Sequence, residues 1–117
     1  MKKVKFMLIA VCTLFISSVF AQTTNVTDTI KVYGECGMCQ NRIQKVLKVK
    51  GVSSAIWDTE TKLLIVSYNP DIITNDDIQR RVALAGHDTD KFRATDQAYN
   101  KLPGCCMYQR KISKLKN

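Results

Sequence analysis

The sequence predicts one α+β domain in which two helices pack on one face of a four-stranded antiparallel sheet. The prediction rests on three short segments with alternating or branched apolar residues, typical of strands, on a short fourth segment after the second helix, and on two longer amphipathic segments, typical of helices. Their order along the chain is strand, helix, strand, strand, helix, strand, which is the order of a ferredoxin-like fold. The expected strands are residues 28–33, 52–58, 62–68 and 87–93, and the expected helices are residues 38–50 and 74–85.

The first expected helix has an apolar face and a clear end. Cys39, Ile43 and Leu47 recur every four residues and therefore fall on one side of a helix. Lys50 places a positive charge in the last turn, where the helix dipole favours it, and Gly51 then ends the helix.

The second expected helix begins at Thr74 and ends before Gly86. Thr74 and Asp77 have the spacing of a capping box, in which each residue satisfies a free amide of the other. Ile78 and Val82 supply the apolar face.

The two middle strands are expected to pair as a hairpin. Residues 59–61 form a short reversal between two segments that are rich in branched and aromatic residues. Trp57 and Tyr68 lie in these segments, and we expect both in the core.

The first 21 residues have the layout of a secretory signal peptide. Lys2, Lys3 and Lys5 precede an uncharged apolar run that is short for a membrane span. Val19 and Ala21 are acceptable residues at the −3 and −1 positions of a cleavage site after Ala21. We therefore expect a periplasmic or secreted protein with no stable membrane insertion after the signal is removed.

The rest of the chain is long enough for one domain with a modest core. Residues 22–27 form a polar leader, residues 28–94 form the domain, and residues 95–117 form an extension. The extension carries the adjacent pair Cys105 and Cys106 and a basic tail.

The net charge of the chain is +8, and much of the excess positive charge lies in the C-terminal tail. Arg110, Lys111, Lys114 and Lys116 gather at the end of the chain, where we expect them to be solvated. We likewise expect Asp88 and Asp90 to lie in solvated turns. A nucleic-acid-binding protein would instead carry basic residues and aromatics across a folded face, so no nucleic-acid partner is expected.

Cys36 and Cys39 form a Cys-x-x-Cys pair where the first strand ends and the first helix begins. Amide groups at a helix start lower the pKa of a thiol there. Two converging thiolates bind soft ions such as Cu(I) or zinc in preference to magnesium or calcium. A structural disulfide and a thioredoxin-like thiol–disulfide exchange are the alternatives for this pair.

Residues 32–43 resemble the metal loop of heavy-metal-associated domains. This family includes copper chaperones, the amino-terminal domains of copper-transporting ATPases and periplasmic mercury-binding proteins. Cys36, Cys39 and Ile43 match the family pattern, and the Gly-Val pair at residues 51–52 matches the start of its second strand. The methionine that usually precedes the first cysteine is absent, and the loop is one residue shorter.

The resemblance implies that Cys36 and Cys39 bind Cu(I), with Hg(II), Zn(II) or Cd(II) as other possible ions. It also places His87 beside the metal loop, either as a third, weak ligand or as a partly buried loop residue. Met38 either fills the core position of the missing methionine or lies near the metal.

Cys105 and Cys106 follow the part of the chain that the resemblance covers. If the extension folds back, they could join Cys36 and Cys39 in a four-thiolate site. They could equally bind a second ion or form disulfides, including bridges to another chain.

These observations predict an exported protein that sequesters a soft metal ion or transfers it to a metal-transporting membrane protein or another metallochaperone. Nothing in the sequence resembles a paired-carboxylate site, a nucleophile with its base, or a phosphate loop, so an enzyme is not expected. A periplasmic thiol–disulfide redox protein is the alternative function.

Overall fold

The computed structural model describes residues 24–110, which form a sheet, two long helices and a short C-terminal region. The predicted signal peptide, the start of the polar leader and the basic tail beyond Arg110 lie outside the described residues. The elements are β1 (Val26–Lys31), α1 (Gly37–Val46), β2 (Val52–Trp57), β3 (Leu63–Tyr68), α2 (Asn75–Leu84), α3 (Asp96–Asn100) and the 3-10 turn η2 (Gly104–Cys106).

The sheet consists of three antiparallel strands in the order β1-β3-β2, so β3 is central. β1 pairs with β3 along its whole length, starting with Val26 opposite Tyr68. Residues 26–27, which were predicted as the end of the polar leader, therefore belong to the sheet. β2 and β3 form the predicted hairpin.

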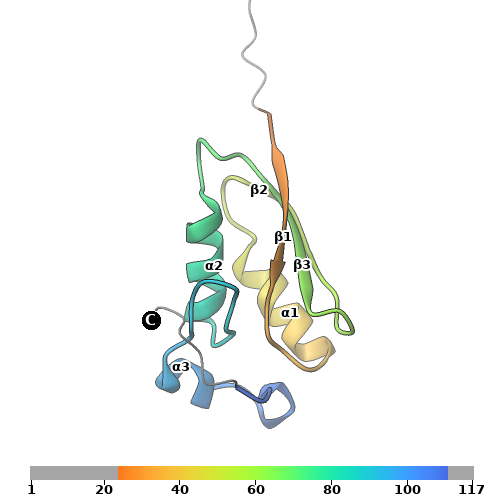
Figure 1. The fold of residues 1–117 in the computed structure, drawn as a ribbon, viewed down its shortest axis with the longest axis vertical. Helices are drawn as coiled ribbons and strands as arrows, with labels where there is room; N and C mark the ends of the chain where they lie inside the picture. The colour runs from red at the N-terminus through yellow and green to blue at the C-terminus, as the bar shows by residue number, and fades with distance from the viewer. Residues whose placement is uncertain (1–23, 111–117) are drawn as a thin grey trace, which may run out of the picture.

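One face of the sheet is buried and the other is exposed. In β3, Leu64, Val66 and Tyr68 are buried whereas Ile65 is half exposed, because successive residues of a strand point to opposite faces. α1 and α2 lie together on one side of the sheet, as Figure 1 shows. The α+β architecture with both long helices on one face is confirmed.

Trp57 and Tyr68 are both buried, as predicted. Trp57 has no exposed surface, and its indole Nε1–H donates a hydrogen bond to the carbonyl oxygen of Val32 at 3.0 Å. A buried Trp usually has such a partner for its N–H group. This bond ties the end of β2 to the chain just before the first cysteine.

α1 ends at Val46, short of the predicted end at Lys50. The amides of Leu47 and Lys48 donate to carbonyls three residues back instead of four, which tightens and terminates the helix. Gly51 then adopts a φ of +98°, where Ile72 and Ile73 leave no room for a side chain.

α2 begins at the predicted capping box. The Thr74 hydroxyl accepts from the Asp77 amide at 3.1 Å, and the Asp77 carboxylate accepts from the Thr74 amide at 3.2 Å. Gly86 follows the helix with a φ of +106°. Ile78 and Val82 are buried, so the predicted apolar face is confirmed.

The prediction of a fourth strand at residues 87–93 is wrong within the described chain. An isolated bridge joins Thr89 to Val32. The Thr89 amide donates to the Phe92 carbonyl at 2.8 Å and closes a turn, and the Asp90 carboxylate accepts the last amide of β1 at 3.0 Å. Since turn and side-chain hydrogen bonds satisfy these groups, no strand ladder forms.

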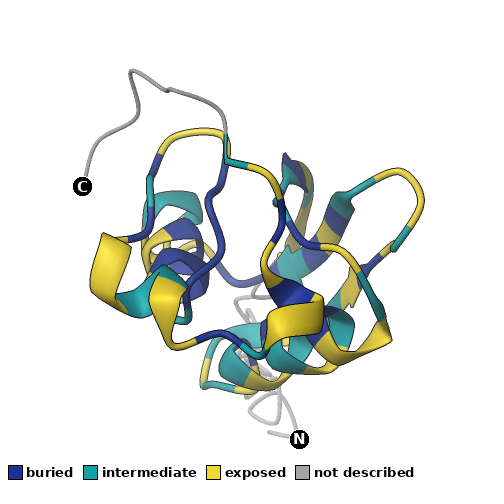
Figure 2. Cartoon of the chain, turned by 90° about the horizontal axis from the view of Figure 1, so that it is seen from below, coloured by how far each residue is buried: buried dark blue, intermediate teal, exposed yellow. Residues whose placement is uncertain are grey.

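The C-terminal region folds back onto the domain. α3 and η2 lie at the same end of the molecule as the loop between β1 and α1 (Figure 1). Seen from that end in Figure 2, buried and exposed surfaces alternate along this region, with Leu102, Cys106 and Tyr108 among the buried residues. Within residues 24–110, no helix combines the length and the apolar character needed to cross a membrane.

Candidate metal centre

The loop between β1 and α1 places Cys36 and Cys39 at the start of the helix. Cys36 is the residue before the first helical turn and has an extended backbone, and Cys39 lies within that turn. Gly34 packs so closely on Trp57 that an added Cβ would come within 3.0 Å of the indole ring. The loop therefore packs directly on the buried Trp57 of the core.

Three thiol sulfurs converge at this helix start. The Sγ atom of Cys36 lies 3.9 Å from that of Cys39 and 4.0 Å from that of Cys106. All three sulfurs lie within 4.8 Å of one another. Cys39 and Cys106 are fully buried, Cys36 is half-buried, and the cysteines of the described chain are not joined in disulfides. Such a group of sulfur donors suits a soft ion.

Backbone amides favour a negative charge on the Cys36 sulfur. The Cys39 amide hydrogen-bonds to the Cys36 sulfur and, with a smaller contribution from Met38, lowers the pKa of Cys36 to about 7. The Glu35 amide donates to the Cys39 sulfur at 3.5 Å. A thiolate ligand is therefore available near neutral pH without a nearby base.

Cys106 lies in a more apolar place than Cys36. Burial raises the pKa of the Cys106 thiol, and the neighbouring cysteine sulfurs raise it further. In the apo protein the Cys106 thiol is therefore protonated. A soft ion that binds there displaces the proton, so binding releases protons to solvent.

Cys105 lies at the exposed rim of this group, next to the buried Cys106 in the sequence. Its side chain is exposed, and its sulfur lies 3.6 Å from the Met38 sulfur. A hydrogen bond with Cys36 raises the pKa of Cys105. Met38 is 49% exposed, so it does not fill a core position; it lies at the rim of the thiol group.

His87 is fully buried and lies outside the thiol group. Its Nδ1 atom lies 2.8 Å from the Tyr33 carbonyl oxygen, to which only an Nδ1–H can donate. Nε2 is then the unprotonated nitrogen, and it has no hydrogen-bond partner within the described chain. Burial lowers the pKa of His87. The structure thus places His87 beneath the metal loop as a buried residue.

Tyr108 anchors the segment that carries Cys106. Its hydroxyl donates to the Gly86 carbonyl at 2.8 Å and accepts from the Asp88 amide at 2.8 Å. Its ring stacks on His87 with the centroids 5.7 Å apart and meets the Tyr99 ring edge-on at 5.1 Å. The extension is therefore attached to the turn after α2 through both polar and aromatic contacts.

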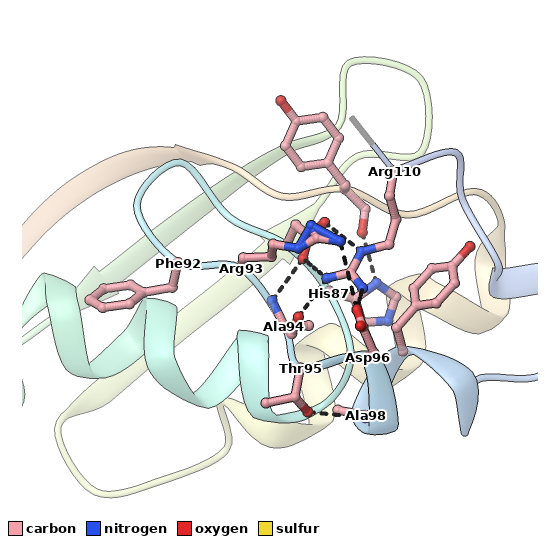
Figure 3. Close-up of polar contacts among 12 residues, drawn as sticks. His87, Phe92, Arg93, Ala94, Thr95, Asp96, Ala98 and Arg110 are labelled. Atoms are coloured by element: carbon pink, nitrogen blue, oxygen red, sulfur yellow. Dashed lines mark hydrogen bonds and ion pairs between the residues drawn. The ribbon is translucent and has the colours of Figure 1, made fainter. Parts of the chain in front are cut away.

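Arg110 and Asp88 form a second anchor, contrary to the prediction that both are solvated. The guanidinium Nη2 and Nε atoms lie 2.8 and 3.0 Å from the two carboxylate oxygens of Asp88. The side chains are only 11% and 4% exposed. Figure 3 shows Arg110 also reaching Asp96 and the backbone of Ala94. Asp90 is exposed, as predicted.

Sequence reasoning missed Tyr108 and Arg110 as residues that position the site. Their signal is the alternation in the extension, where Cys106, Tyr108 and Arg110 face inward and Cys105 and Met107 face solvent. A period of two is typical of an extended segment packed on a surface. The basic composition of the tail conceals this pattern.

Comparisons of the sequence and the fold with known proteins point to metal-binding domains. The family model described as heavy-metal-associated domain matches residues 29–88. The fold is similar to that of the N-terminal domain of a potential copper-translocating P-type ATPase from Bacillus subtilis in the Cu(I)-loaded state. Identity is 27% and the TM-score is 0.55, over 62% of this chain and 94% of that one.

Two further solved structures have a similar fold. The ZiaAN sub mutant is 31% identical with a TM-score of 0.51, over 56% of this chain and 96% of that chain. The CopZ metallochaperone is 23% identical with a TM-score of 0.53, over 55% of this chain and 98% of that one. A search of curated protein sequences gives no match. Because the family model spans more than half of the sequence, this chain belongs to the heavy-metal-associated domain family.

Proposed function

We propose that this protein binds Cu(I), or another thiophilic ion such as Hg(II), Zn(II) or Cd(II), as cargo at Cys36 and Cys39. It holds the ion or hands it on, and it carries out no catalysis. The observation that carries the proposal is the convergence of these two thiols, 3.9 Å apart, at the helix start of a heavy-metal-associated domain.

The chemistry of the pair supports a soft cargo. Both ligands are sulfur, which prefers Cu(I) and similar ions over hard cations. The lowered pKa of Cys36 supplies one thiolate near neutral pH. A soft ion held by few ligands can be passed on stepwise, as thiols of a partner replace the protein's own sulfurs one at a time.

Export and the partner are part of the same proposal. The layout of residues 1–21 supports secretion with cleavage after Ala21, and this would place the domain in the periplasm or outside the cell. A metal-transporting membrane protein or another metallochaperone fits as donor or acceptor. The similarity to a domain of a potential copper-translocating ATPase supports this class of partner.

The test is an anaerobic titration of the reduced protein with Cu(I), Hg(II) and Zn(II) in competition with a chelator. We expect one tight equivalent of a soft ion and its loss in Cys36→Ser/Cys39→Ser. Ser53→Ala, at an exposed position of β2, is the control and should bind as the parent does. Tight binding retained by the double variant would contradict the proposal. Absence of tight binding, together with turnover of a disulfide substrate, would favour the redox alternative.

A further inference from the structure

We propose that the C-terminal extension completes the metal site, with Cys106 supplying a third thiolate to the ion held by Cys36 and Cys39. This inference rests on the proposed function. It assigns the ligand class as a thiophilic ion that accepts three sulfur ligands. It also gives Tyr108 and Arg110 the role of positioning residues that hold Cys106 in place.

The separations between the sulfurs fit this coordination. Metal–thiolate bonds are about 2.3 Å long, so an ion at the centre of three sulfurs needs them about 4.0 Å apart. The Cys36 sulfur lies 3.9 Å from that of Cys39 and 4.0 Å from that of Cys106. The third separation is no more than 4.8 Å. A shift of the Cys106 side chain by a fraction of an ångström would bring the group to the ideal spacing.

The burial of Cys106 separates it from its neighbour Cys105. Cys106 has no exposed surface, whereas Cys105 is exposed and lies against Met38. The short turn η2 produces this difference, because the Cys106 amide donates to the Pro103 carbonyl at 2.8 Å and fixes which side chain turns inward. Cys106 is therefore buried within the thiol group, and Cys105 lies at its exposed rim.

The extension is held on the domain by contacts that do not involve sulfur. Tyr108 bonds to the backbone on both sides of His87, and Tyr99 donates to the Tyr108 carbonyl at 2.6 Å. Arg110 makes a two-pronged ion pair with the buried carboxylate of Asp88. These anchors lie within four residues of Cys106 along the chain, so they fix its position before any ion arrives.

A third thiolate changes how the ion leaves. With Cys106 in place, the site is closed on the side of the extension, and a partner thiol must replace Cys106 or detach the extension before it reaches the ion. The docked extension therefore slows the loss of the ion. Detachment of the extension exposes the ion and favours its transfer to a partner.

The test uses the full mature chain loaded with one equivalent of Cu(I). X-ray absorption gives the number of sulfur neighbours, and competition with a chelator gives the affinity. We expect three sulfurs in the parent and in Cys105→Ser, which is the matched control one residue away. We expect two sulfurs and an affinity at least about tenfold lower in Cys106→Ser.

Each outcome separates this inference from the proposed function. Loss of binding in Cys36→Ser/Cys39→Ser, with three sulfurs in the parent and two in Cys106→Ser, supports both. Two sulfurs in the parent, or an unchanged count in Cys106→Ser, overturns the inference while the two-thiolate function stands. A drop in Cys105→Ser instead of Cys106→Ser overturns the assignment to Cys106.

A second variant tests the anchoring without removing any sulfur. Arg110→Gln keeps all four cysteines of the mature chain and should lower the sulfur count from three to two as the extension detaches, with folding of the domain checked by the amide NMR spectrum. A purely structural role for Arg110 would leave the count at three, which would overturn its role as a positioning residue.

Discussion

The two parts of the thiol group are positioned in different ways. Cys36 and Cys39 are brought together by a local feature, the start of α1, whose hydrogen bonds join residues close in the sequence. Cys106 is held in the same place by its neighbours Tyr108 and Arg110, which contact residues far away along the chain, chiefly Gly86 and Asp88. A local motif can therefore be recognised in a sequence, whereas a docked segment depends on pairs that only the fold brings together.

The largest effect is expected from removing the support of the local pair. Trp57→Ala would leave a cavity beneath Gly34 and remove the indole donor to the Val32 carbonyl. We expect the free energy of unfolding to fall by about 3 to 5 kcal/mol, measured by urea denaturation. Trp57→Phe fills most of the space and should lose less. An equal loss in the two variants would show that the hydrogen bond, and not the packing, dominates.

The next largest effect is expected from breaking the anchor of the extension. Arg110→Gln leaves the buried Asp88 carboxylate without its counter-charge, which should cost about 3 kcal/mol of unfolding free energy. Arg93→Gln is the control, because its partner Asp96 is 79% exposed and the ion pair should contribute less than about 1 kcal/mol. Adding Asp88→Asn to Arg110→Gln should restore part of the loss. If both arginine variants lose the same unfolding free energy, the buried ion pair stabilises the fold no more than the Arg93 pair does.

His87 connects the two regions and should give the protein a pH dependence. It hydrogen-bonds Tyr33 and stacks on Tyr108, and the charged groups that act on it are Arg42 and Asp88. Burial places its pKa below the ordinary value of 6.5, so the unfolded chain binds a proton more readily than the folded one. Stability is therefore full above pH 6.5 and declines as the pH falls towards the lowered pKa.

Urea denaturation of the parent and of His87→Gln between pH 7.5 and about 5 measures this dependence. The slope of stability against pH should be shallower in the variant over that window. An identical slope in both proteins would mean that His87 does not carry the effect.

The smallest effect is expected away from both regions. Thr74→Ala removes one half of the capping box of α2 and should cost about 1 kcal/mol of unfolding free energy. The Asp77 carboxylate loses its hydrogen bond with the Thr74 side chain, the largest of the causes that lower its pKa, and keeps the bond from the residue 74 amide. The stability lost between about pH 5 and 3 should therefore also decrease. Metal affinity should stay unchanged. A changed affinity would show that α2 is coupled to the thiol group.

The parts of the fold that sequence reasoning predicted are those with local causes. The start of α2 follows from Thr74 and Asp77, and the hairpin follows from the short reversal between β2 and β3. The fourth strand was predicted wrongly, because the turn at residues 89–92 depends in part on the distant side chain of Gln79, whose amide oxygen accepts from Lys91 at 3.0 Å. No pattern within the segment reveals that partner.

The residues of the candidate site also fall into those that local sequence predicts and those that depend on distant contacts. The pairing of Cys36 with Cys39 follows from their spacing before a helix, and the family resemblance is confirmed. The choice between Cys105 and Cys106 could not be made from sequence, since it depends on how η2 turns against the domain. Arg110 resembles the rest of a basic tail until Asp88 is known to be buried beside it.

The buried charge of Asp88 has a consequence for where this protein can be cut. The family match ends at residue 88, and a boundary drawn shortly after it would remove Arg110. The shortened domain would keep every residue that identifies its family and yet carry a carboxylate in its interior with no cation beside it. We therefore expect a domain cut at the end of the family match to be less stable than the chain that extends to Arg110.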